Sequence, residues 1–105
     1  LNAPPTRPLV AQAAAVPGAA PQVEIDLVTR AWGTQLDLRG SSLPTGQVLY
    51  LSVTNREGHA YDVASWTGTP SGRTTLTAAC WMKTSDIAQV QVHTRDGGAI
   101  ATATT

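Results

Sequence analysis

Few side chains in this sequence are of the types that carry out catalysis, and their spacing does not combine them into a known motif. The two imidazoles, His59 and His93, have no carboxylate or cysteine at a spacing that builds a metal site. The serines lack a Gly-x-Ser-x-Gly elbow, and the carboxylates lie singly rather than as a catalytic pair. We therefore predict a protein that is not an enzyme and that binds no cofactor and no metal ion. We expect His59 at the mouth of a hairpin and His93 at the end of a strand.

The single cysteine, Cys80, cannot form a disulfide within the chain. A reactive thiol needs a nearby base or positive charge that lowers its pKa, and only Lys83 is close in sequence. Free cysteines are among the most buried residue types, so we expect a half-buried structural thiol. The alternative is a possible intermolecular thiol, which an unpaired cysteine allows in an oxidising compartment.

The chain has three tryptophans, Trp32, Trp66 and Trp81, and no phenylalanine. Because bulky apolar side chains are scarce, we expect the tryptophans mainly to fill the core. Trp81 and Trp66 are nevertheless possible partner-binding residues, since aromatic side chains are favoured at binding hot spots. Trp81 stands out because Cys80-Trp81-Met82-Lys83 is expected to be a connection rather than a strand.

The charge of the chain does not indicate a class of binding partner. Seven basic and seven acidic residues cancel to a formal net charge of zero, and the basic residues are scattered rather than clustered. Binding to phosphate backbones requires a basic stripe, so we predict no nucleic-acid binding. No run of apolar residues approaches the roughly 18 that cross a bilayer.

From residue 22 onward the sequence alternates apolar and polar residues, which is the pattern of half-buried β-strands. The first run places Val23, Ile25 and Leu27 on one face and Glu24 and Asp26 on the other. Further alternating runs occur around residues 36–38, 48–53, 61–65 and 90–92, and Leu76 and Ile100 lie in Thr/Ala-rich runs that we also expect to be strands. The run at 48–53 is apolar on both faces, which favours a central strand.

Turn sequences separate these runs, among them Leu43-Pro44-Thr45-Gly46 and Arg95-Asp96-Gly97-Gly98. Strands separated by such turns at intervals of roughly 8–12 residues indicate a sandwich or barrel. The sequence therefore predicts an all-β fold, a small Ig-like antiparallel β-sandwich of about seven strands. The one helical turn that we expect lies at residues 84–87, where hydroxyl and carboxylate side chains could cap it.

Residues 1–21 have a different composition, rich in proline and alanine. Each proline fixes φ near −65° and removes a backbone donor, so the segment favours extended, solvated conformations. We predict a Pro/Ala-rich linker at residues 1–21 and a β-sandwich domain at residues 22–105.

Several short motifs occur in an order that resembles one known family. They are Ala31-Trp32-Gly33-Thr34, Ser42-Leu43-Pro44-Thr45-Gly46, Leu49-Tyr50-Leu51-Ser52-Val53, Arg56-Glu57-Gly58, Ala64-Ser65-Trp66 and, later, Asp86-Ile87-Ala88-Gln89-Val90-Gln91-Val92 followed by Thr94-Arg95-Asp96-Gly97. The last two fit a short turn, a strand and a final hairpin. The series is similar to the extracytoplasmic C-terminal domain of actinobacterial transmembrane anti-sigma factors of the zinc-associated type. The resemblance covers roughly residues 22–105.

This resemblance implies a regulatory role in signal transduction. In that family a single transmembrane helix precedes the domain, a linker like residues 1–21 joins the two, and a cytoplasmic part sequesters a sigma factor until regulated intramembrane proteolysis releases it. The domain would lie on the extracytoplasmic face of the cell membrane, as a sensory or protease-gating domain. Its partners would be a site-one-type protease or an envelope signal protein. The chain lacks the His-x₃-Cys-x₂-Cys pattern of the cytoplasmic part, so it would reach the sigma factor only through that part.

A second hypothesis comes from a different class of protein. An Ig-like adhesion or ligand-binding module of the cell envelope could use Trp81 or Trp66 as its anchor. The exposure of the tryptophans distinguishes the two hypotheses, because an anchor must reach solvent.

Overall fold

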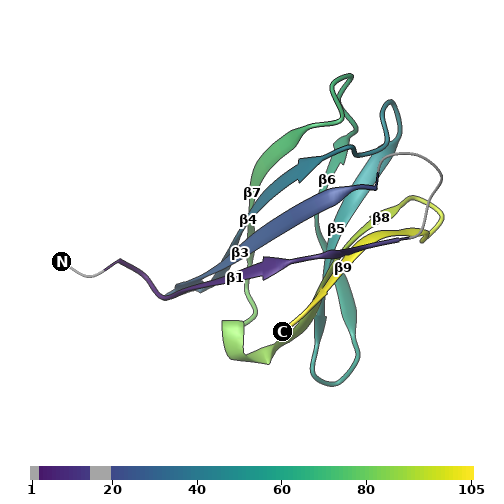
Figure 1. Cartoon of the computed structure of the whole chain (residues 1–105). Helices are drawn as coiled ribbons and strands as arrows, with labels where there is room; N and C mark the ends of the chain where they lie inside the picture. The colour runs from purple at the N-terminus through teal and green to yellow at the C-terminus, as the bar shows by residue number, and fades with distance from the viewer. Residues whose placement is uncertain (1–2, 15–19) are drawn as a thin grey trace.

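A computed structural model describes residues 3–14 and 20–105 of the chain. These residues form nine β-strands and one 3₁₀ turn, arranged as two facing antiparallel sheets (Figure 1). The elements are β1 (Thr6–Val10), β2 (Gln12–Ala13), β3 (Gln22–Arg30), β4 (Gly33–Ser41), β5 (Val48–Asn55), β6 (Ala60–Thr67), β7 (Thr74–Cys80), η1 (Thr84–Asp86), β8 (Ile87–Thr94) and β9 (Ala99–Thr104).

The four-stranded sheet has the order β1-β3-β4-β7, and the five-stranded sheet has the order β2-β9-β8-β5-β6. The connections after β4, β6 and β7 cross from one sheet to the other, as in sandwiches of the Ig class. Seven strands, β3 to β9, lie within residues 22–105. The predicted small, Ig-like antiparallel β-sandwich is therefore confirmed, together with the single helical turn before β8.

The core lies between the two sheets, and the alternating apolar residues fill it as the sequence pattern predicts. Strand β5 lies between β8 and β6, so its predicted central position is confirmed. The fully buried side chains of the core are mostly leucine, isoleucine and valine, and they come from both sheets: Val23, Ile25, Leu27, Leu36, Leu38, Leu49, Leu51, Val53, Ile87, Val90 and Val92.

The linker prediction is wrong for residues 6–13. Strand β1 pairs with β3 over five residues, and β2 pairs with β9, so this segment lies along both sheets (Figure 1). Pro8 is compatible with β1 because that strand lies at a sheet edge, where a missing backbone donor is tolerated. Leu9 and Ala11 turn into the core and are 7% and 9% exposed. The part of the predicted linker at 15–19 lies outside the described residues.

Candidate functional site

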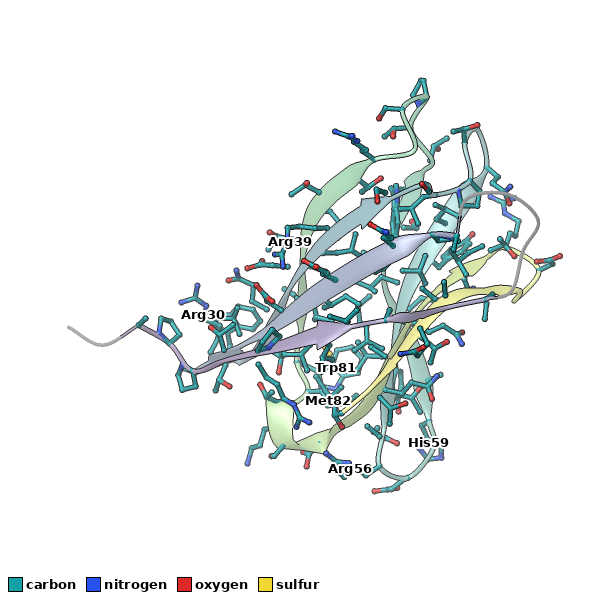
Figure 2. The ribbon with its side chains drawn as sticks, in the orientation of Figure 1. Arg30, Arg39, Arg56, His59, Trp81 and Met82 are labelled. Atoms are coloured by element: carbon teal, nitrogen blue, oxygen red, sulfur yellow. The ribbon has the colours of Figure 1, made fainter. Side chains whose placement is uncertain are left out.

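Three chain segments meet at one end of the sandwich. The register pairs Arg30 with Gly33, Thr34 with Cys80, and Asn55 with Ile87. The β3–β4 turn, the β7–β8 connection and the β5–β6 turn therefore all project from the same end. In the view of Figure 2, Trp81 and Met82 of the β7–β8 connection lie between Arg30 and Arg56.

This end carries three exposed aromatic side chains, one from each of the turn region, the connection and strand β6. Trp81 is 63% exposed, Trp32 is 53% exposed and Tyr61 is 38% exposed. The rings of Tyr61 and Trp81 meet edge to face, with centroids 5.1 Å apart and planes at 82°. We call Trp32, Tyr61 and Trp81 the aromatic end. Exposed aromatic clusters of this kind are typical of binding surfaces.

Trp81 stands between two open hollows on the surface. One, of about 450 Å³, is bordered by Tyr61, Arg56, Glu57 and Asp86. The other, of about 500 Å³, is bordered by Trp32, Arg30 and hydroxyl groups, and no carboxylate is among the described residues that line it. Trp81 and Lys83 border both hollows. The second hollow therefore combines two indole rings with two cationic groups.

The chain on either side of Trp81 is fixed in the core. Cys80 and Met82 are 1% and 7% exposed, so the alternation of strand β7 continues past its end and leaves the indole facing outward. Any Cβ at Gly33, whose φ is +146°, would overlap the carbonyl oxygen of Cys80. The β3–β4 turn thus approaches the β7–β8 connection as closely as only glycine permits.

A small hydroxyl network also anchors the connection. The fully buried Thr34 hydroxyl donates to the Met82 carbonyl over 2.8 Å. Thr34 also shares a hydrogen bond of 2.8 Å with the Thr84 hydroxyl, which lies 3.0 Å from that of Thr29. Because buried polar groups are costly to leave unpaired, this network stabilises one conformation of the connection. The hydroxyls near residue 84 were expected to cap the helical turn, but no side chain donates or accepts a cap hydrogen bond at the N-terminus of η1.

The cationic groups at this end are held by neutral partners. Arg30 donates from Nε and Nη2 to the Gln35 side-chain oxygen, at 3.1 and 3.0 Å. Arg56 donates from Nε to the Ser85 carbonyl over 2.8 Å. Neither contact neutralises the guanidinium charge, so both cations remain available to an anionic group.

The two other predicted site residues, Trp66 and Cys80, do not contribute to this exposed surface. Trp66 of β6 pairs with Leu49, which places it at the opposite end of the sandwich, and it packs against the core. Its Nε1 atom is buried and has no hydrogen-bond partner among the described residues. Trp66 is thus only partly exposed, and its role in partner binding stays a prediction.

Cys80 is a buried free thiol. Its side chain faces the core from strand β7, where no second molecule can reach it in the folded domain. The possible intermolecular thiol is thus contradicted, and the structural role expected for a buried cysteine accounts for the residue.

The exposure of Trp32 was missed by sequence analysis. Its place in Ala31-Trp32-Gly33, a tight turn between two nine-residue strands, is the signal that could have revealed it. A residue at the tip of such a turn has no facing sheet to pack against.

The two histidines occupy different surroundings. His59 is exposed directly after the β5–β6 turn, as predicted, and its backbone N–H donates to the Asn55 side chain. His93, near the end of β8, stacks on Tyr50 at 5.2 Å and contacts Asp62 through Nε2 at 2.8 Å. Partial burial disfavours the charged ring, but hydrogen bonds with Asp62 and the Thr94 carbonyl outweigh it and raise the pKa of His93 above its ordinary value.

Among residues 3–14 and 20–105, no cluster of histidine, cysteine and carboxylate groups is suited to a metal ion.

The N-terminal segment is a second feature of functional interest. We call residues 6–13, which comprise β1 and β2, the strap. Backbone hydrogen bonds next to the strap reach both sheets. On β3, Thr29 N–H donates to the Pro5 carbonyl and Ala11 N–H donates to the Val23 carbonyl, and on β9 the Ile100 carbonyl accepts from Ala14 N–H, each over 2.9 Å. Only Leu9 and Ala11 are buried, whereas Val10 is 72% exposed. The strap is therefore paired along its backbone but held by little apolar contact.

Comparisons of the chain with known protein families, with curated proteins and with solved structures find no match. Within the part of the chain that the structure describes, no helix has the length and apolar character needed to cross a membrane.

Proposed function

We propose that this chain is the extracytoplasmic sensory and protease-gating domain of a membrane-bound anti-sigma factor of the actinobacterial, zinc-associated type. The ordered motifs over residues 22–105 support this proposal. The structural observation that best supports the proposal is the strap, in which β1 is an edge strand of one sheet and β2 is an edge strand of the other.

The strap supplies a physical mechanism for gating. Proteases cleave segments that are locally unfolded, and segments with few buried contacts open at a lower free energy than the core. The strap has two buried side chains, and its backbone is paired with β3 and β9. While it is docked it resists cleavage, and a signal that detaches it exposes the backbone to a site-one-type protease.

In this proposal the domain acts through cleavage rather than through direct contact with the transcription machinery. It lies on the extracytoplasmic face of the membrane, tethered by the transmembrane helix of the full-length protein. Its partners are the protease or an envelope signal protein, and the sigma factor is bound by the cytoplasmic part. Cleavage in the strap region starts regulated intramembrane proteolysis, which raises sigma-factor-dependent transcription.

Two adjacent strap residues provide a matched test in the full-length protein. Leu9→Ala removes a core contact and should cost about 2 kcal/mol or more of docking free energy, whereas Val10→Ala changes an exposed side chain. We expect Leu9→Ala to raise anti-sigma cleavage and the activity of a sigma-dependent reporter, and Val10→Ala to leave both unchanged. Deleting residues 22–105 without any effect on cleavage or on the reporter would refute the proposal.

The aromatic end supports a second candidate function, a ligand-binding or adhesion module of the cell envelope. The observation that favours it is the second hollow, where Trp32 and Trp81 stand beside Arg30 and Lys83. Indole rings stack on flat apolar groups, and the cations suit an anionic substituent. Such a surface fits a ligand whose rings have an apolar face and that carries a carboxylate, for example an acidic glycan.

Tryptophan fluorescence tests this candidate. Titration with acidic cell-wall glycan fragments should change the emission of the wild-type chain, and Trp81→Ala should weaken binding at least about tenfold, the range of a hot-spot residue. Val10→Ala, an exposed apolar residue outside the aromatic end, is the control. Equal binding by the Trp81→Ala and Val10→Ala variants would exclude the aromatic end as the ligand site.

A further inference from the structure

The two sheets differ in how their edge strands are protected from pairing with other chains. An edge strand exposes unpaired backbone groups, and proteins block such edges with proline, charge, bulges or short strands. Strand β1 contains Arg7 and Pro8, and β2 has only two residues. Strand β6 contains Asp62 and has a register shift where it pairs with Leu51 and Ser52. Three of the four edges that the structure describes therefore have a blocking feature.

Strand β7 is the fourth edge, and it has none of these features. Its sequence, residues 74–80, is Thr-Thr-Leu-Thr-Ala-Ala-Cys, without charge or proline. It pairs with β4 in regular register over all seven residues, without a bulge. Its other side has no strand partner. An uncharged, regular edge of this length is a template for strand addition.

We propose that β7 pairs antiparallel with β7 of a second copy of this chain, so that two four-stranded sheets join into one of eight strands. The proposal is independent of the proposed function. Pairing of all seven residues about a two-fold axis centres on Thr77, which then lies opposite Thr77 of the second copy. Isologous contacts of this kind require a self-complementary surface, and β7 meets this requirement on both faces.

The outward face of β7 consists of Thr75, Thr77 and Ala79, all exposed. In the two-fold register Thr75 lies opposite Ala79, so no bulky or charged side chains collide. On the inward face Leu76 lies opposite Ala78, a large residue beside a small one. Cross-strand pairs of threonine and small residues are favourable or neutral, whereas like charges would be destabilising.

The residues flanking β7 favour a second copy over an unrelated peptide. Extending the same register by one residue at each end places Arg73 of one copy opposite Trp81 of the other. Both side chains are exposed, and both follow the outward parity of Thr75, Thr77 and Ala79. A guanidinium group over an indole ring is a favourable cation–π arrangement. The two-fold axis forms this contact twice, which a peptide lacking these residues could not do.

The size of the contact predicts a weak dimer. One seven-residue strand pair lies at the small end of specific interfaces, below roughly 1,200 Å² in total. We therefore expect association that depends on concentration in the range of about 10 µM to 1 mM.

Cysteine cross-linking tests the register directly. Thr77→Cys places two thiols opposite each other across the axis, within the Cα separation of about 4.4–6.8 Å that a disulfide requires. The control Thr75→Cys lies on the same face of the same strand, but its two copies are about 13 Å apart along the strand direction. Under mild oxidation we expect covalent dimers from Thr77→Cys and not from Thr75→Cys. Cys80 is buried and does not interfere.

Sedimentation of the chain without added cysteines gives the second test. We expect Ala79→Lys to weaken the dimer at least about tenfold, because it places a charge on the open edge. Val10→Lys places the same charge on the blocked edge β1 and should leave the dimer unchanged, and circular dichroism checks that both variants are folded. A wild-type chain that stays monomeric up to about 1 mM, or equal cross-linking of the two cysteine variants, would overturn the proposal.

Discussion

At the scale of single residues, the position of Trp81 depends on groups beneath it that do not themselves reach the surface. The Thr34 hydroxyl fixes the Met82 carbonyl, and Cys80 and Met82 fill the core on either side. The exposed indole is thus presented by a rigid connection rather than by a mobile loop.

Replacing Thr34 with valine tests this support. Thr34→Val keeps the shape of the side chain but leaves the Met82 carbonyl without its hydroxyl donor, which should cost about 1–3 kcal/mol of unfolding free energy. Thr29→Val, at an exposed position of the same network, should cost less than about 0.5 kcal/mol. Urea denaturation followed by tryptophan emission measures both. Equal losses in the two variants would show that the buried bond does not anchor the connection.

His93 gives the domain a pH-dependent contribution to stability. Its pKa is raised in the folded chain, against partial burial, by Asp62 and the Thr94 carbonyl. The protonated ring is therefore favoured by folding, and the stabilisation is complete below the ordinary histidine pKa of about 6.5 and lost as the pH rises through the raised value. In the Asp62→Asn variant, we expect an NMR titration of His93 to give a lower pKa and the stability to fall less as the pH rises. A pKa of His93 that is the same in both proteins would contradict the role of Asp62.

The aromatic residues differ in how far their surroundings can be predicted from the sequence. Trp81 could be singled out because it lies in a connection, and its exposure confirms it as a surface residue. Trp32 and Tyr61 could not be grouped with it, since 48 residues lie between Trp32 and Trp81 in the sequence and only the sheet register brings them together. Trp66 is also a tryptophan, but it lies in strand β6 and packs against the core, which the residue type alone does not reveal.

At the scale of elements, the β3–β4 turn and the β7–β8 connection depend on a close approach at Gly33. Gly33→Ala introduces a Cβ that overlaps the Cys80 carbonyl, so we expect a loss of at least about 3 kcal/mol of unfolding free energy. Gly58 also has a positive φ, of +88°, but its Cβ would point into open space. Gly58→Ala should therefore cost only the backbone strain of a non-glycine residue at a positive φ, about 1–2 kcal/mol of unfolding free energy. Similar denaturation midpoints for the two variants would mean that the turn can move away from the connection.

Strands β3 to β9 could be predicted from the sequence and the strap could not, for a physical reason. Strands β3 to β9 were predictable because half-buried strands must alternate apolar and polar residues. The strap was missed because it has only two buried positions, Leu9 and Ala11, which follow Pro8 in a segment with several other prolines. Prolines argue against a central strand but are compatible with an edge, and an edge position is decided by tertiary pairing rather than by local sequence.

At the scale of the whole molecule, the sandwich has two ends with different surfaces and two sides with different edges. The aromatic end gathers Trp32, Tyr61 and Trp81 with three cations and two carboxylates, and the carboxylates border only the hollow beside Tyr61. The strap lies along one side of the four-stranded sheet, and the open edge β7 lies on the other. Strap release and β7 pairing therefore involve opposite edges of that sheet, so a dimer leaves the strap free to detach.

The central claim is that detachment of the strap controls cleavage, and a disulfide lock tests it most directly. Val10 and Glu24 are directly opposite each other in the β1–β3 pair, and both side chains are exposed. In the full-length protein, the double variant Val10→Cys with Glu24→Cys should form a bond that holds the strap on β3, and each single variant is a control. We predict that the oxidised double variant resists signal-dependent cleavage, that reduction restores it, and that the single variants are cleaved normally. Cleavage of the oxidised, locked protein at the wild-type rate would contradict the account.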